Sequence, residues 1–203
     1  MPKDSLDLSK VSEIMKAGSM VNFNRNNIRD DNETIIKGQW DPVVHDLYRM
    51  GAAKVTGTTL EMTGQREDNP KVNCVNVIYE DGCATMGSVL APGIIYSSSF
   101  SGCVFYLYRG PLGHIIGVHA SRASKKLADP SGWFDKRGGT KIFEWDSLGV
   151  IKQGLFGSVV VCLGKTDLDV YVLQMNKEKI DSVIKHTNIK TWKTAPKIDI
   201  TLD

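Results

Sequence analysis

A long succession of short apolar runs is the feature that most restricts the fold of this chain. From residue 53 to residue 174 these runs are rich in Val, Ile, Thr and aromatic residues, and Gly, Pro and Asp separate them. Branched and aromatic side chains favour strands, whereas the separating residues favour turns. The strands expected after residue 70 cover 72–79, 83–86, 100–108, 114–120, 141–145, 157–163 and 169–174. Asp81-Gly82 lies between the first two and predicts a tight hairpin.

Three short helices are expected beside these strands, over residues 5–16, 41–51 and 177–185. The first has apolar residues at helical spacing, the second begins at an Asp-Pro pair that can cap it, and the third has Asn176 as a candidate N-cap. Polar segments are expected to be loops at 22–33, 64–70 and 121–139, the last with one helical turn. Helices and strands do not alternate regularly, so the predicted fold class is α+β. We expect a β-sandwich of mixed or antiparallel sheets, flanked by helices and long loops.

The size and charge of the chain limit its class of partner. Its 203 residues suit a single domain, 1–203, with a core of its own. The 25 basic and 23 acidic residues are mixed along the sequence and give a formal charge of +2. This charge favours neither nucleic acid nor an anionic membrane, so the expected partner is a protein or a small molecule. We expect a monomer.

The sequence has no apolar run of the length that a signal peptide or a membrane span needs. We therefore expect synthesis in a cytosol and, for an exported bacterial protein, a route without a cleavable signal. The cysteines are then interpreted as thiols: Cys74, Cys83, Cys103 and Cys162. Neither the cysteines nor the four histidines show the spacing of a zinc motif. We expect no metal and no cofactor.

The segment 100–120 is typical of a strand, a five-residue loop and a second strand, and it carries the candidate catalytic residues. If Pro111 is the centre of this hairpin, Cys103 faces His119. Directly opposed residues of an antiparallel pair point to the same face, with Cβ atoms about 4.5 to 5.5 Å apart. Side chains alternate between faces, so a register shift of one residue would separate the two groups. The register predicts a thiol beside an imidazole.

A cysteine beside a histidine can act as a nucleophile, because the thiolate is the reactive form. A neighbouring imidazolium would lower the thiol pKa from about 8.5, so Cys103 and His119 are expected to rest as an ion pair. Attack on a carboxamide would create an oxyanion, for which the backbone N–H of Cys103 and a neighbouring amide are candidate donors. Gly102 would let the substrate approach closely. His119 would protonate the departing ammonia and then activate water, with a third group to orient its ring.

The same residues resemble those of a known group of enzymes. Ser-Gly-Cys at 101–103, followed across a hairpin by Val-His at 118–119, resembles the catalytic core of the cytotoxic necrotizing factor and Burkholderia lethal factor group of glutamine deamidase toxins. The chemoreceptor deamidases of the CheD type share the general arrangement. The small size and the Met-Lys-Ala-Gly-Ser segment at 15–19 are most similar to the lethal factor, a standalone toxin. The resemblance covers the opening helix and residues 97–120.

The resemblance implies that Cys103 is the nucleophile and that His119 is the base. It also implies a third catalytic contact from the residue six positions before the cysteine, which is threonine in the lethal factor and in CheD and is Ser97 here. Serine keeps both the hydroxyl and the backbone carbonyl, either of which could hold the imidazole. Phe100 stands where the group usually has leucine, and we interpret this as a packing change. The implied fold is a β-sandwich flanked by helices.

The implied reaction is the hydrolysis of a glutamine carboxamide in a host protein to glutamate, with release of ammonia. Within the group, the necrotizing factors act on Rho-family GTPases, and the lethal factor acts on the RNA helicase of translation initiation. Similarity to the lethal factor makes the helicase the first expected substrate and a Rho-family GTPase the second. Such a toxin would be made in the bacterial cytoplasm and would act in the host cytosol. The sequence assigns no substrate-binding residue.

Other interpretations also fit the sequence. A noncatalytic binding module would bury Cys103 as an inert core residue and present the 121–139 loop, with Trp133 and Phe134, to a partner. An enzyme with the same cysteine could transfer the thioester to an amine, as a transglutaminase does, or cleave a peptide bond. The sequence around the papain cysteine is absent, which argues against a papain-like protease. His114 is expected to be structural, with a place in the wall of the cleft as the alternative, and the three other cysteines are expected to be structural.

Overall fold

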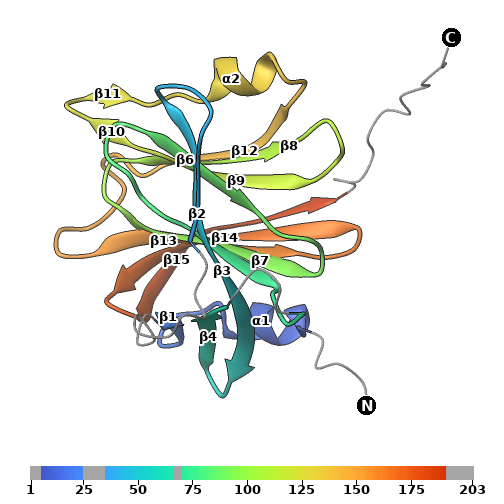
Figure 1. Ribbon diagram of the computed structural model, residues 1–203. Coiled ribbons are helices and arrows are strands. Elements are labelled where there is room, and N and C mark those ends of the chain that lie inside the picture. Colours follow the sequence, from blue (N-terminus) through green and yellow to red (C-terminus); the bar gives the residue numbers. More distant parts are fainter. Residues whose placement is uncertain (1–5, 25–34, 66–69, 191–203) are drawn as a thin grey trace, which may run out of the picture.

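The computed structural model describes residues 6–24, 35–65 and 70–190 of the chain. Within these residues it contains two short helices, α1 (Leu8–Ile14) and α2 (Ser131–Asp135), and a large number of strands (Figure 1). The strands are β1 (Met20–Asn24), β2 (Ile35–Gln39), β3 (Val44–Thr56), β4 (Thr59–Gly64), β5 (Cys74–Val77), β6 (Ala84–Ser88), β7 (Gly93–Phe100), β8 (Val104–Arg109), β9 (Ile115–Ala120), β10 (Arg122–Ala123), β11 (Lys126–Leu127), β12 (Thr140–Asp146), β13 (Phe156–Leu163), β14 (Asp167–Asn176) and β15 (Lys179–Lys190).

The described strands form one mixed sheet, apart from β10 and β11, which pair only with each other. The strand order is β12-β8-β9-β6-β3-β4-β1-β15-β14-β13-β7-β5, with β2 attached to β3. β5 pairs with both β3 and β7, so the ladder closes on itself through the long strand β3. In Figure 1, β6, β9, β8 and β12 form an upper layer, and β7, β13, β14 and β15 form a second layer below it. This arrangement confirms the predicted β-sandwich with flanking helices.

Both faces of the upper layer are buried. Phe105 of β8 belongs to the same buried cluster as Val159 and Val161 of β13, in the core between the layers. On the outer face, Tyr108 stacks on Phe134 of α2, with 3.8 Å between the ring centroids. Another cluster lies on the far side of β13 and β14, under α1 and β4. Each large apolar side chain buried in this way contributes about 1.5–3 kcal/mol, and the three clusters fix which side chains of β8 and β9 point between the layers.

The opening helix predicted from the sequence is confirmed over Leu8–Ile14. Asp7 caps it, because the Asp7 carboxylate accepts hydrogen bonds from the backbone N–H groups of Ser9 and Lys10. The segment 121–139 contains one helical turn, α2, as predicted, but also the short paired strands β10 and β11, which were not predicted. The loops expected over 22–33 and 64–70 lie largely outside the described residues, and residues 22–24 belong to β1. No helix in the described part of the chain has the length and apolar character needed to cross a membrane.

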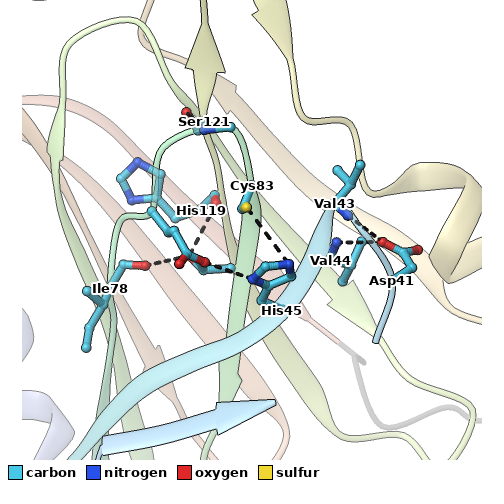
Figure 2. Close-up of polar contacts among 11 residues, drawn as sticks. Asp41, Val43, Val44, His45, Ile78, Cys83, His119 and Ser121 are labelled. Atoms are coloured by element: carbon cyan, nitrogen blue, oxygen red, sulfur yellow. Dashed lines mark hydrogen bonds and ion pairs between the residues drawn. The ribbon is translucent and has the colours of Figure 1, made fainter. Parts of the chain in front are cut away.

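The helix predicted over residues 41–51 is wrong, because this segment leads into β3. The bonds expected of a helix cap do form: Asp41 Oδ1 accepts from the backbone N–H groups of Val43 and Val44, both at 2.7 Å (Figure 2). They close a turn, and the chain then pairs with β2, β6, β5 and β4 in succession. A cap contributes only about 1 kcal/mol, so pairing on both sides of β3 outweighs it.

The helix predicted over residues 177–185 is also wrong. Asn176 pairs with Lys179, so residues 177 and 178 form a two-residue turn between β14 and β15. Lys177 has a φ of +54°, which tight hairpin turns require. Buried and exposed side chains alternate along the first half of β15, and this period of two is that of a strand. Asn176 is therefore a turn residue rather than an N-cap.

The tight hairpin predicted at Asp81-Gly82 does not form, although the chain turns there. Gly82 has a φ of +75°, as the turn requires, but β5 and β6 do not pair with each other. Both pair with β3 instead: β6 at Val44–Asp46 and β5 at Tyr48–Gly51. The segment between β5 and β6 therefore lies beside the first half of β3. This placement brings the side chains of residues 79–83 close to two of the histidines.

Candidate active site

The hairpin that carries Cys103 and His119 has a different register from the predicted one. Phe105 of β8, rather than Cys103, pairs with His119 of β9, and the centre of the hairpin is Leu112 rather than Pro111. The pairing is displaced by two residues, which restores the original face because side chains alternate with a period of two. Cys103 belongs to the same core cluster as Phe105. The predicted register is wrong, but the thiol and the imidazole remain diagonal neighbours on one face.

Cys103 lies at the end of a tight loop between β7 and β8. Ser99, at the bulge near the end of β7, has a φ of +70°, which strains a serine by about 1–3 kcal/mol, and Gly102 in the loop has a φ of +150°. Ser147 holds the loop: its Oγ donates to the Cys103 carbonyl at 2.7 Å and accepts from the Gly102 N–H at 2.8 Å. A Cβ atom at Gly102 would approach only Leu148, at 4.0 Å. The space beside the candidate nucleophile is therefore open at Gly102.

Arg122 of β10 holds the same loop from another side. Its Nε donates to the Gly102 carbonyl at 2.8 Å, and its guanidinium forms an ion pair with Asp146. Burial raises the pKa of the Cys103 thiol, whereas the backbone N–H of Arg122, which donates to the sulfur, lowers it; the net shift is upward. Cys103 is only 8% exposed. It is therefore a nearly buried thiol that stays protonated at neutral pH.

His119 is fully buried and is held through one ring nitrogen. The Ser97 Oγ lies 3.0 Å from His119 Nδ1, and the same hydroxyl donates to the Val77 carbonyl at 3.0 Å. Because serine has one proton to donate, Nδ1 carries the ring proton and Ser97 accepts it. Nε2 then carries a lone pair, and it has no hydrogen-bond partner within the described residues. The imidazole therefore keeps its basic nitrogen unpaired.

Two aromatic rings fix the plane of the His119 imidazole. Phe100 stacks on it with 3.9 Å between the ring centroids and 11° between the planes. Tyr79 meets it edge-on, with the centroids 5.3 Å apart. The residue interpreted from the sequence as a packing change is thus the surface on which the candidate base rests. Burial among these rings lowers the pKa of His119 to about 3.

The ion pair predicted between Cys103 and His119 is not the favoured state of this arrangement. Burial raises the pKa of the thiol and lowers that of the imidazole, so both groups are neutral near pH 7. The backbone N–H of Cys103 makes no hydrogen bond within the described part of the chain and can serve as an oxyanion donor. The N–H of Gly102 is bonded to Ser147. The loop thus offers one free amide beside the thiol.

The other residues that the sequence singled out lie outside the Cys103–His119 cluster. Phe134 is buried, and the Arg137 guanidinium lies 4.1 Å from the centroid of the Trp133 ring, so both aromatic residues hold their segment against the sheet. A Cβ atom at Gly110 would lie 2.3 Å from His114 Cε1, because the His114 ring packs on that glycine. The remaining cysteines are two buried thiols and one that is half-buried: Cys74, Cys162 and Cys83.

A cavity of about 390 Å³ lies away from this cluster. Its walls include Trp40, Trp133 and Ile116. Ile116 and His119 are an odd number of residues apart on β9, so the cavity and the imidazole lie on opposite faces of that strand. With Cys103 at 8% exposure and His119 at 0%, the cysteine site is closed in this structure.

Sequence reasoning missed the supports of the site. Ser147 lies 44 residues from Cys103 and Arg122 lies 20 residues from Gly102, and neither belongs to a motif that marks such a contact. Tyr79 gave no signal either. Comparison with protein-family models, curated proteins and solved structures finds no match to this chain. Its function therefore has to be inferred from the chemistry of the side chains themselves.

Proposed function

We propose that the chain is a protein-glutamine deamidase that uses Cys103 as nucleophile and His119 as base. The state of His119 supports this most directly, because Ser97 accepts from Nδ1 and Nε2 stays unpaired. A buried histidine that served packing alone would be expected to pair both nitrogens, since an unsatisfied buried polar atom costs about 1–3 kcal/mol. An unpaired Nε2 is the atom that can take a proton from a thiol.

The proposed reaction passes through a thioester. The Cys103 proton moves to His119 Nε2 as the sulfur attacks the carboxamide carbon, and the Cys103 N–H stabilises the oxyanion. The proton then passes to the amide nitrogen, the carbon–nitrogen bond breaks, and ammonia leaves. His119 next removes a proton from water, which attacks the thioester carbon. Cleavage of the carbon–sulfur bond yields glutamate and restores the thiol.

A neutral resting pair suits an enzyme that acts only on a bound protein. The raised thiol pKa keeps Cys103 unreactive towards solvent, and its 8% exposure leaves little room for small electrophiles. A glutamine side chain has to displace part of the site wall to reach the sulfur, and the open side at Gly102 is the natural entry. Substrate binding would thus both open the site and complete it.

The proposed substrate is a host protein, with the translation-initiation RNA helicase first and a Rho-family GTPase second. The resemblance of residues 97–120 to the deamidase toxins supports this choice. Deamidation replaces a neutral carboxamide with a carboxylate of nearly the same size, so a single event can disable a water-positioning or contact glutamine. In this proposal the chain is a monomeric toxin or effector, made in a bacterial cytoplasm and active in the host cytosol.

The burial of the two groups favours a second candidate function. Exposures of 8% and 0% are those of core residues, and a noncatalytic binding module would have an inert Cys103. Such a module would bind its partner through the outer surface around residues 121–139. A transglutaminase would share the thioester and differ only in the acceptor. The three functions therefore differ in whether Cys103 reacts and in what resolves the thioester.

The test uses a eukaryotic cytosolic extract prepared in ¹⁸O-labelled water, to which wild-type protein or Cys103→Ser is added. Peptide mass spectrometry then searches for glutamines converted to glutamate. We expect one strongly enriched site that carries ¹⁸O with wild type and is absent with Cys103→Ser, because hydrolysis takes its oxygen from water. Amine adducts at that glutamine would indicate transglutamination instead.

The matched control is Cys162→Ala, which removes a buried thiol on β13 outside the cluster. It should modify the same glutamine as the wild type does. If no glutamine changes, and a thiol-alkylating reagent leaves Cys103 unlabelled in extract where partners are bound, the deamidase proposal fails. The binding module is then the better account.

A further inference from the structure

A second cysteine–histidine cluster lies on the same face of the sheet as the candidate active site. His45 of β3 pairs with Thr85 of β6, and Thr85 pairs with His119 of β9. Paired residues on adjacent strands point to the same side, and neighbouring strands are about 4.8 Å apart. His45 and His119 are therefore on one face, about 10 Å apart across β6. Figure 2 shows His45 with Cys83 beside it and His119 beyond β6.

The side chains of Glu80 and Cys83 both lie against the imidazole of His45. Its Nδ1 lies 2.8 Å from Glu80 Oε2, and its Nε2 lies 3.9 Å from Cys83 Sγ. The three possible ligand atoms lie within 4.8 Å of one another. One ion binds only one of the two ring nitrogens, so the side chain that contacts the other nitrogen has to turn towards the ion. Glu80 and Cys83 lie 35 and 38 positions from His45 in the sequence.

The separations are close to those of ligands that share one transition-metal ion. Zinc binds thiolate sulfur at about 2.3 Å and imidazole nitrogen or carboxylate oxygen at about 2.0–2.2 Å, so two ligand atoms of a tetrahedral site lie about 3.3–3.7 Å apart. The 3.9 Å between Cys83 Sγ and His45 Nε2 is a few tenths of an ångström longer. The Glu80 side chain is 43% exposed, so the protein interior does not enclose it, and the ion would draw the three ligand atoms closer together. Nitrogen, sulfur and oxygen donors together suit Zn²⁺ rather than Mg²⁺ or Ca²⁺.

We propose that His45, Glu80 and Cys83 bind a divalent cation of the zinc class, with a fourth position left to water. The proposal does not depend on the deamidase function. Sequence reasoning did not find this site because its ligands have no motif spacing; pairing of both β5 and β6 with β3 brings them together. The ion would tie the segment between β5 and β6 to β3. That segment also carries Tyr79, which touches the ring of His119.

The test titrates the reduced, chelator-treated full-length protein with Co²⁺ and then with Zn²⁺. A thiolate ligand gives Co²⁺ an intense sulfur-to-metal charge-transfer band, which reports Cys83 directly. We expect one equivalent of Co²⁺ to bind, the band to appear, and Zn²⁺ to displace it. His45→Gln and Glu80→Gln should each weaken binding by about tenfold or more, and Cys83→Ser should remove the charge-transfer band.

The matched control is His186→Gln. His186 Nε2 lies 2.8 Å from Asp169 Oδ1, which reproduces the histidine–carboxylate pair without a thiol, so this variant should bind Co²⁺ as the wild type does. Because a variant can fail to fold, a second measurement uses the wild type alone: Zn²⁺ should protect Cys83 from alkylation, read peptide by peptide. A charge-transfer band that survives Cys83→Ser, or alkylation of Cys83 that is equally fast with and without Zn²⁺, would overturn the proposal.

Discussion

The two cysteine–histidine clusters use the same residue types on the same sheet face but have opposite surroundings. His119 is fully buried, stacked on Phe100, and paired with the neutral hydroxyl of Ser97. His45 is partly exposed and is paired with the carboxylate of Glu80. Burial beside a hydroxyl keeps the His119 imidazole neutral, whereas a carboxylate beside His45 offers a second ligand for a metal ion. The two clusters therefore differ in the side chain that pairs with the imidazole, Ser97 or Glu80, and in how deeply the imidazole is buried. These two properties, rather than the presence of a cysteine and a histidine, determine which chemistry we propose for each cluster.

The largest effect is expected from the partner of the buried histidine. Ser97→Ala should lower kcat/KM for glutamine deamidation by about 10²-fold, because His119 loses the acceptor that fixes its tautomer. Ser97→Thr keeps the hydroxyl and should restore most of the rate. The measurement is ¹⁸O incorporation with each purified variant on the substrate identified in extract. Unchanged activity in a folded Ser97→Ala protein would remove Ser97 from the site and weaken the comparison with His45.

The second largest effect is expected on the pH dependence of stability, and it tests whether His119 is buried as deeply as its 0% exposure indicates. The folded-state pKa of His119 is about 3, well below the unfolded value of about 6.5, so the unfolded chain binds more protons between these values. The contribution of the neutral His119 to the free energy of unfolding is present above about pH 6.5 and is lost as the pH falls. Between pH 7 and pH 5 His119 should therefore cost the wild type about 2 kcal/mol of unfolding free energy.

Urea unfolding of wild type and His119→Gln at the two pH values measures this loss. The variant should lack it, whatever its stability at pH 7. His186→Gln removes an exposed histidine and should lose as much stability on acidification as the wild type does. If wild type and His119→Gln lose the same unfolding free energy, the His119 imidazole is not held neutral. The difference in burial would then no longer distinguish this site from the cluster of His45, Glu80 and Cys83.

Much of the strand content could be predicted because it follows from local patterns. The runs at 104–109, 115–120, 140–146 and 156–163 form strands within a few residues of their predicted limits. The segments at 41–51 and 177–185 failed for a common reason. Their cap-like residues, Asp41 and Asn176, do make local turns, but strand pairing on β3 and β15 decides the conformation that follows. Local signals mark where the chain turns and do not say what it pairs with.

Some residues of the candidate site could likewise be predicted from local patterns, whereas others could not. Cys103 and His119 could be found because hairpin parity survives a displacement of two residues, and the resemblance singled out Ser97. Ser147, Arg122 and the three residues of the proposed metal site could not, because only the tertiary ladder brings them to their partners. The stacking of Phe100 on His119 also follows a bulge in β7 at Ser99, whose positive φ angle leaves no clear mark in the sequence.

The smallest effect concerns the loop that carries Cys103. Ser147→Ala removes two hydrogen bonds to that loop and should lower the free energy of unfolding by about 1–2 kcal/mol. Ser158→Ala is a matched control, because Ser158 is a buried serine whose hydroxyl has no partner in the described chain, and it should be neutral or slightly stabilising. Chemical unfolding measures both.

Alkylation then decides whether the two clusters are independent. In Ser147→Ala the loop should open more often, so Cys103 should be labelled faster than in the wild type. The rate at Cys83 should stay the same, because both described hydrogen bonds of the Ser147 hydroxyl go to the Cys103 loop. Peptide-resolved labelling reports both thiols in one experiment. An equal increase in the alkylation rate of Cys83 would show that the two clusters open together. The cluster of His45, Glu80 and Cys83 would then form part of the wall around Cys103 and His119.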